Sequence, residues 1–159
     1  MSNLNRIGLD EQKVVKLAKK LNELLANYQI FYLNTRGFHW NIKGKAFFEL
    51  HIKFEELYED SVVKIDEIAE RILTLGHQPL HTYTDYLRVA KIKEIKNVSD
   101  GVQALKKILK GYEVLLPLER DILELSAQAA DEGTNALMSD YIREQEKLIW
   151  MYSAYIANE

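Results

Sequence analysis

The sequence predicts an all-α protein, a four-helix bundle whose long central crossover loop contains a short helix. The 159 residues include only 7 Gly and 2 Pro, which suits long uninterrupted helices better than turn-rich β structure. Hydrophobic residues make up 47% of the chain and recur at three- and four-residue steps in four long segments, as on one face of a helix. Residues 77–98 lack this pattern, and a connection of that length is typical of a bundle with a crossover.

The first two helices are predicted from their periodicity and their end signals. The first covers residues 10–36, with Asp10 as its N-cap. Gly37 is expected to end it, because glycine adopts the left-handed cap conformation at low cost. The second covers residues 45–75 and is ended by Gly76 in the same way.

The remaining helices follow the crossover. A short helix is predicted within it, over residues 85–90. The third long helix is predicted over residues 99–129, with Ser99 as its N-cap and with Pro117 inside it, where proline should bend the helix. The last long helix is predicted to start near Thr134.

Length, composition and net charge exclude several classes of protein. One domain over residues 1–159 is expected, with a short N-terminal tail over residues 1–9. The absence of Cys excludes disulfides, thiolate zinc sites, iron–sulfur clusters and a cysteine nucleophile. No signal peptide and no apolar run of about 20 residues is found, so a cytoplasmic protein without membrane contact is expected. The net charge of −3 disfavours a globally basic nucleic-acid binder.

Four potential metal ligands share one stripe of the second predicted helix. The stripe spans about 100° of the helical wheel and is centred roughly 130° away from the apolar stripe of the same helix. Apolar side chains also lie on it, so carboxylates buried there would need a metal or a cationic partner. The four residues are His51, Glu55, Asp66 and Glu70.

The spacing of these four residues excludes a metal site within one chain. Glu55 and Asp66 are about 16 Å apart along the helix axis, and His51 and Glu70 nearly twice as far. Metal–ligand distances of roughly 2.0–2.6 Å cannot span such gaps. The two pairs nevertheless share one midpoint. A two-fold axis through that midpoint would set Glu55 opposite Asp66 of a second copy, and His51 opposite its Glu70, which predicts two identical sites per dimer.

His39 adds a fifth candidate ligand, in the turn expected between the first two helices and beside Trp40. Two imidazoles with several carboxylates suit iron, zinc or manganese rather than calcium. No histidine of this chain has a glutamate three residues before it. The Glu-x-x-His motif of bundles that hold a di-iron site within one chain is therefore missing.

Several motifs resemble the Dps family of mini-ferritins, and the similarity covers nearly the whole chain. They are GFHWNIKG at residues 37–44, FFELH at 47–51, DEIAER at 66–71 and EKLIWM at 146–151, together with the spacing His-x11-His before Asp-x3-Glu. The resemblance implies a ferritin-like four-helix subunit. It also implies a hollow cage of twelve subunits, built from two-fold dimers.

The family resemblance further implies ferroxidase sites at the two-fold interfaces. His39, His51 and Glu55 would come from one subunit, and Asp66 and Glu70 from its partner. Such sites oxidise Fe(II) with hydrogen peroxide or O₂ and deposit ferric mineral in the cage, which protects against oxidative damage. Zinc and manganese are expected competitors for iron. The family usually has Asp where this chain has Glu55, a longer side chain at that corner of the site.

Three further residues receive roles from the resemblance. Trp40 would donate electrons or trap radicals, although packing at an interface also explains a large aromatic residue there. Asp131 and Glu132 lie where the family lines a three-fold iron-entry pore with acidic residues. A favourable charge at the N-terminus of the last helix explains these two residues nearly as well.

Two other functions are possible for this sequence. Many relatives coat DNA through a lysine-rich tail, but here residues 1–10 carry only Arg6 against Asp10. Lys91, Lys93 and Lys96 form a small basic patch, which is the only opening for DNA. DNA binding is therefore expected to be weak or absent, and association with the nucleoid stays open as an alternative location. A purely structural oligomer would pair the acidic stripe with basic residues, and few lie on that stripe.

Overall fold

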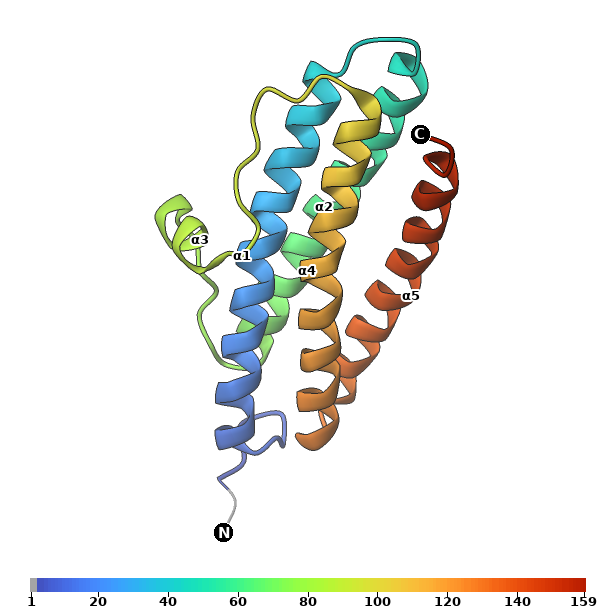
Figure 1. The fold of residues 1–159 in the computed structure, drawn as a ribbon. Coiled ribbons are helices and arrows are strands. Elements are labelled where there is room, and N and C mark those ends of the chain that lie inside the picture. The colour runs from blue at the N-terminus through green and yellow to red at the C-terminus, as the bar shows by residue number, and fades with distance from the viewer. Residues whose placement is uncertain (1–2) are drawn as a thin grey trace.

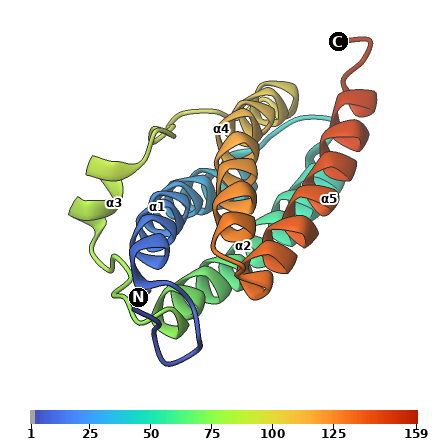
Figure 2. The ribbon, with the colours of Figure 1, turned by 90° about the horizontal axis from the view of Figure 1, so that it is seen from below.

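The computed structural model describes residues 3–159 and contains four long helices and one short one, with no strand in this range. In Figure 1, α1 and α4 run side by side along the front of the bundle, with α2 and α5 behind them. Seen from below in Figure 2, the short α3 lies outside the bundle, next to α1. The predicted all-α four-helix bundle with a short crossover helix is confirmed. The helices are α1 (Glu11–Asn41), α2 (Phe47–Thr74), α3 (Tyr83–Val89), α4 (Gly101–Gln128) and α5 (Glu132–Tyr155).

The core forms where the apolar stripes of the long helices meet. Each stripe contributes side chains that are at most 1% exposed, and burial of one such side chain stabilises the fold by about 1.5–3 kcal/mol. None of the helices described carries a stretch long and apolar enough to cross a membrane. Fully buried members of the core include Leu17, Leu21 and Leu24 of α1, Phe54 and Ile68 of α2, and Ile108 and Leu115 of α4.

Polar side chains cap the N-termini of all the helices except α2, whose N-cap is Ala46. Asp10 caps α1 as predicted and accepts a hydrogen bond from the backbone N–H of Lys13. The prediction of Ser99 as a cap was wrong by one residue. Asp100 accepts the bond from the backbone N–H of Gln103 at 2.9 Å, and a carboxylate also interacts favourably with the helix dipole.

The start of the chain joins the bundle through turns. Of the predicted tail over residues 1–9, residues 1 and 2 lie outside the described part. Residues 3–9 form turns before α1, and an isolated antiparallel bridge pairs Leu4 with Asp10. The backbone N–H groups of Ile7 and Leu9 both donate to the side-chain oxygen of Asn5, which holds these turns together.

The prediction that Gly37 ends the first helix was wrong, because α1 continues to Asn41. Phe38 is buried in this added turn and packs edge-on against Phe54, with ring centroids 6.3 Å apart. Burial of such a ring outweighs the cost of about 1 kcal/mol for glycine within a helix. His39 therefore lies in the last turn of α1 and not in the loop that follows it.

Asparagine side chains of α1 hold the crossover in place. The Oδ1 atom of Asn27 accepts hydrogen bonds from the backbone N–H groups of Lys91 and Ile92, at 2.9 and 3.0 Å. Asn34 accepts in the same way from the N–H of Ile95 at 2.9 Å. These bonds satisfy backbone groups that have no partner in a helix, so an irregular segment lies in a defined position beside α1.

Candidate metal centre

The imidazole rings of His39 and His51 form a reciprocal pair. The rings are stacked, with centroids 3.8 Å apart and planes 11° apart. The Nδ1 atom of His39 lies 2.6 Å from the carbonyl oxygen of His51, and Nδ1 of His51 lies 2.7 Å from the carbonyl oxygen of His39. A carbonyl oxygen only accepts, so each Nδ1 carries the proton. In the neutral rings Nε2 then holds a lone pair, as a metal ligand requires.

This pairing follows from the place where α1 ends. His39 lies in the last turn of that helix, where backbone carbonyl groups have no partner within the helix. Its carbonyl oxygen is therefore free to accept from His51, which lies in the second turn of α2. The extra turn of α1, which sequence analysis missed, is what brings the two rings together.

Two aromatic side chains hold the histidine pair from either side. Phe47 stacks on His51, with ring centroids 4.8 Å apart, and Tyr58 lies edge-on to His39 at 5.2 Å. Desolvation and the nearby carboxylate of Glu55 raise the pKa of the Tyr58 phenol. Sequence analysis gave neither aromatic residue a role, although Phe47 precedes His51 by one helical turn and the spacing was visible.

The predicted carboxylate ligands lie on the same helix but do not reach one common point. Glu55 is half-buried one turn beyond His51, whereas Asp66 and Glu70 are exposed near the far end of α2. Among residues 3–159, no three histidine or carboxylate side chains are grouped so that they could hold a metal ion. The structure thus brings together the two imidazoles, and it leaves Asp66 and Glu70 apart from them.

The exposed face of α2 is partly apolar. Phe48 is 80% exposed, and Val62 and Val63 are 45% and 58% exposed, all of them on α2. Exposed apolar side chains grouped on one face are typical of a surface that binds another protein. The face of α2 therefore has the character of an interface that carries potential ligands at both ends.

Trp40 follows His39 directly and points to the surface. It is 63% exposed, and the guanidinium carbon of Arg36 lies 4.7 Å from the centroid of its ring. The same guanidinium group lies over Tyr32 and donates a hydrogen bond to its hydroxyl oxygen. The indole is thus held against Arg36 by a cation–π contact.

The two acidic residues assigned to a pore differ in their surroundings. Asp131 is 2% exposed, caps α5, and pairs with Arg71 at 2.6 Å. It also accepts hydrogen bonds from the backbone N–H and the hydroxyl group of Thr134. The capping explanation therefore accounts for Asp131. Glu132 is exposed in the first turn of α5 and makes no ion pair among the described residues.

A second polar cluster, which sequence analysis did not find, lies at the centre of the bundle. Glu119 is fully buried and accepts hydrogen bonds from the Tyr28 hydroxyl group at 2.5 Å and from the Gln145 amide at 3.0 Å. Burial raises the pKa of the Glu119 carboxyl group to about 7. The available signal was the place of Glu119 in the apolar stripe of α4, between Leu115 and Ile122.

This core cluster does not fit a pair of metal ions. It contains one carboxylate, and the charges of Lys64 and Arg120 lower the pKa of that carboxyl group against the larger effect of burial. Lys64 is itself 4% exposed and is bound to Asp60 and Glu144 at 2.8 and 2.9 Å. The paired histidines of α1 and α2 are therefore the better candidate for metal binding.

Comparison with known proteins defines the class and then the family. Residues 18–159 match the family described as Ferritin-like domain, so the bundle is that of a ferritin-like protein. The chain is 45% identical to the DNA protection during starvation protein of Porphyromonas gingivalis, over 93% of each chain. It is 55% identical to an uncharacterized protein of Haemophilus influenzae, over 93% of this chain and 92% of that one.

A solved structure agrees in fold and in sequence. The DPS protein from Vibrio cholerae O1, described as a member of a broad superfamily of ferritin-like diiron-carboxylate proteins, has 58% identity to this chain. The match covers 98% of both chains with a TM-score of 0.95. The chain belongs to the Dps family, as its motifs predicted.

Proposed function

We propose that this protein oxidises Fe(II) at sites shared between two copies of the chain and stores the ferric product inside a hollow dodecamer in the cytoplasm. The observation that carries the proposal is the arrangement along α2. At one end, His39 and His51 present the free Nε2 atoms of fixed tautomers. At the other end, Asp66 and Glu70 are exposed on the same face and lie too far away to meet them within the chain.

A second copy related by a two-fold axis completes the ligand set. His39, His51 and Glu55 of one chain would then meet Asp66 and Glu70 of the other. Imidazole nitrogen and carboxylate oxygen suit iron, and the same donors admit zinc or manganese as competitors. Carboxylate charge favours the oxidised ion, so the site would stabilise the Fe(III) product relative to its Fe(II) substrate.

The oxidant would be hydrogen peroxide, or else O₂, and its consumption together with Fe(II) would protect the cell from oxidative damage. Peroxide accepts two electrons on its way to water. They would come from two Fe(II) ions, or from one Fe(II) ion and Trp40, which lies beside the ligand His39. Iron would enter through a pore lined by acidic residues, to which the exposed Glu132 would contribute more than the capping residue Asp131.

Complementation between two damaged chains tests the shared site. One variant carries His51→Ala and the other Glu70→Ala, so every site is damaged in either one and each should oxidise iron slowly. After the two are unfolded, mixed and refolded together, a site is whole when its His51 comes from the Glu70→Ala chain and its Glu70 from the His51→Ala chain. Random pairing makes about one site in four whole, so activity should recover to about a quarter of wild type.

Two controls make this result decisive. Mass spectrometry of cross-linked dimers shows whether the two variants have mixed, and refolded wild-type protein sets the full activity. A double variant, with both changes in one chain, should gain nothing when it is mixed with either single variant. If mixed dimers form and activity does not rise above that of the separate variants, the site does not combine residues of two chains.

The alternative function is DNA binding with little oxidation of iron. It is favoured by the name of the Porphyromonas gingivalis relative and by the exposed lysines Lys91, Lys93 and Lys96. The net charge of −3 opposes it. Gel-shift titration with plasmid DNA near physiological salt separates the two functions. We expect no shift at protein concentrations where iron oxidation is complete.

A further inference from the structure

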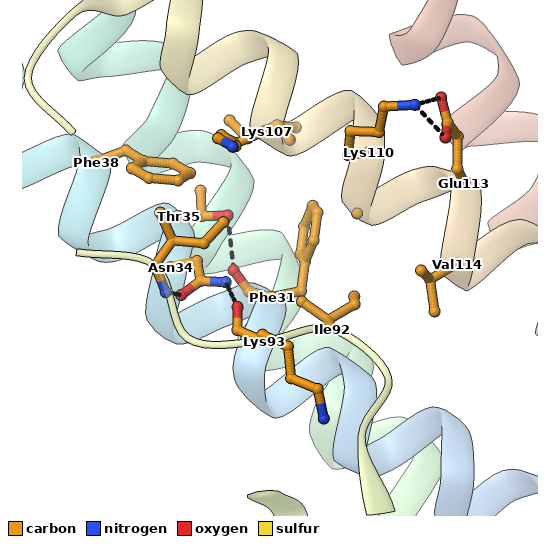
Figure 3. Close-up of a pocket in the computed structure, with 13 residues that line it drawn as sticks. Phe31, Asn34, Thr35, Phe38, Ile92, Lys93, Lys107, Lys110, Glu113 and Val114 are labelled. Carbon is orange, nitrogen blue, oxygen red and sulfur yellow. Dashed lines mark hydrogen bonds and ion pairs between the residues drawn. The ribbon is translucent and has the colours of Figure 1, made fainter. Parts of the chain in front are cut away.

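A groove of about 470 Å³ lies on the side of the bundle formed by α1 and α4, where the crossover passes over them. Figure 3 shows its lining, with Phe31 and Phe38 of α1 facing residues of α4 and of the crossover segment. Phe31, Phe38 and Ile108 form an apolar floor and are themselves well packed into the core. A groove of this volume with apolar walls is within the range of small-molecule binding sites.

The wall formed by the crossover is fixed in place by α1. The Nδ2 group of Asn34 donates a hydrogen bond to the carbonyl oxygen of Lys93 at 2.9 Å, and its Oδ1 atom accepts from the N–H of Ile95 at 2.9 Å. Figure 3 shows the bond to Lys93 beside the phenylalanine floor. Because the wall is already ordered, a ligand would not have to order it on binding, which favours affinity.

The rim of the groove is cationic. Lys107 and Lys110 line it with a single carboxylate, that of Glu113, which Lys110 binds at 2.9 Å. Lys93 also lines the groove, but its ammonium group donates to the carbonyl oxygen of Ala90 at 3.2 Å. Lys107 makes no ion pair with any residue of the described part of the chain. This excess of ammonium groups occurs in a chain whose net charge is −3, so it is a local feature of this surface. An apolar floor below a cationic rim is complementary to an amphiphilic anion.

We propose that this groove binds a medium-chain alkyl carboxylate, one molecule per chain. The alkyl chain would lie on the apolar floor, and the carboxylate would pair with Lys107 at the rim. A chain of about eight to ten carbons is small enough for a groove of this volume. The site is separate from the histidine pair of α1 and α2, and it does not depend on the proposed reaction with iron.

Calorimetric titration of the assembled protein with decanoate, below its micellar concentration, tests the proposal. We expect saturable binding of one decanoate per chain. Decanol, which has the same alkyl chain without the charge, should bind about tenfold more weakly, because it lacks the ion pair. Lys107→Glu should weaken decanoate by at least the same factor and leave decanol unchanged.

The matched control is Lys106→Glu, which makes the same charge change on the adjacent residue of α4, outside the lining of the groove. It should leave the affinity for decanoate within about twofold of wild type. Val114→Trp places a larger side chain in the lining and should weaken both ligands. Equal affinity of the Lys107→Glu and Lys106→Glu variants for decanoate would overturn the proposal, as would heat that never saturates. A short DNA duplex provides a further test. If the duplex displaces decanoate while Val114→Trp has no effect on decanoate binding, the lysines bind phosphate and the proposal is likewise overturned.

Discussion

Two polar clusters in this bundle differ in where the hydrogen-bond partners of their polar groups lie. Glu119 at the centre finds its hydrogen-bond partners within the chain, in the Tyr28 hydroxyl group and the Gln145 amide. His39 and His51 satisfy their Nδ1 atoms within the chain and leave Nε2 free at the surface of α1 and α2. The core cluster, here called the closed cluster, draws its partners from one chain, although Oε2 of Glu119 and Oε1 of Gln145 accept no hydrogen bond. The histidine pair, here called the open cluster, is prepared for groups that a single chain does not place near it.

The two clusters differ in whether a second chain could reach their unpaired atoms. A buried polar group without a partner costs free energy, so the unpaired oxygens of Glu119 and Gln145 lower the stability of the core. The histidine pair fixes its own geometry first and keeps its metal-binding atoms free. Such a preformed set of donors needs only the carboxylates of a second copy to become a metal site.

Removal of His39 should give the largest loss of iron oxidation at the open cluster. His39→Ala removes one ligand and also the imidazole ring that stacks on His51 at 3.8 Å, while the backbone carbonyl group that binds Nδ1 of His51 remains. Since loss of an outer-shell contact alone costs 10–100-fold, we expect iron oxidation to slow on the order of 1,000-fold. Stopped-flow absorbance with Fe(II) and peroxide measures it. His77→Ala, a half-buried histidine near Glu11 and far from the pair, is the control and should leave the rate unchanged.

The stability that the closed cluster contributes should depend on pH and not on iron. The folded-state pKa of Glu119 is about 7, above its ordinary value of 4.5, so the unfolded chain loses this proton first as the pH rises. Its contribution to stability is fully present below about pH 4.5 and is lost as the pH rises to about 7, which lowers the free energy of unfolding by about 3 kcal/mol.

Glu119→Gln should remove this pH dependence. The amide keeps the acceptor for Tyr28, carries no charge, and offers an N–H donor to the buried oxygen of Gln145 that now has no partner. We expect the variant to match wild type near pH 4.5 and to exceed it by about 3 kcal/mol near pH 8, as measured by urea unfolding at one protein concentration. The exposed Glu113→Gln is the control. A variant less stable than wild type at pH 8 would show that the ionised carboxylate is well accommodated.

The apolar side chains between the two ends of α2 should decide whether a second copy of the chain binds there and completes the histidine site. Val62 lies near the proposed two-fold axis, opposite Glu59 of the second copy. Val62→Glu would place two carboxylates together and weaken each such contact by about 2 kcal/mol. Light scattering should then report smaller assemblies. Val15→Glu, at a similarly exposed valine of α1, is the control, and unchanged assembly in both variants would argue against this interface.

The smallest effect is expected at Trp40, which lies beside the open cluster. Trp40→Phe keeps a ring under the guanidinium group of Arg36 and removes the more easily oxidised indole. We expect peroxide-driven iron oxidation to slow by about threefold or less, with loss of an indole radical in rapid-freeze EPR spectra. Trp150→Phe alters a similarly exposed tryptophan of α5 and should preserve that radical. A radical that persists without Trp40 would leave this residue with a packing role only.

The helices and their core faces were predictable because periodic apolar residues dominate each segment. The end of α1 was not, because the burial of Phe38 against Phe54 is a tertiary effect that overrides the local preference of Gly37. His51 and its stripe were visible as a pattern on one helix. The reciprocal contact with His39 was hidden, because it depends on a free carbonyl group at a helix end whose position was misjudged.

The core cluster was hidden for a different reason. Glu119 occupies a position where spacing expects an apolar residue, and its partners Tyr28 and Gln145 come from two other helices. A pattern read along one helix cannot show which side chains of its neighbours will face it. The placement of Asp66 and Glu70 with respect to the histidines stays a prediction, since it depends on a second copy of the chain.

The asparagine contacts to the crossover also have a consequence for the dynamics of the chain. The amide hydrogens of Lys91, Ile92 and Ile95 belong to an irregular segment, yet they are bonded to side chains of α1. Hydrogen exchange at these amides should therefore be slow, and it should follow the opening of α1 rather than local fraying of the loop. During folding the crossover would become ordered only after α1, which acts as the template for a segment that has no regular structure of its own.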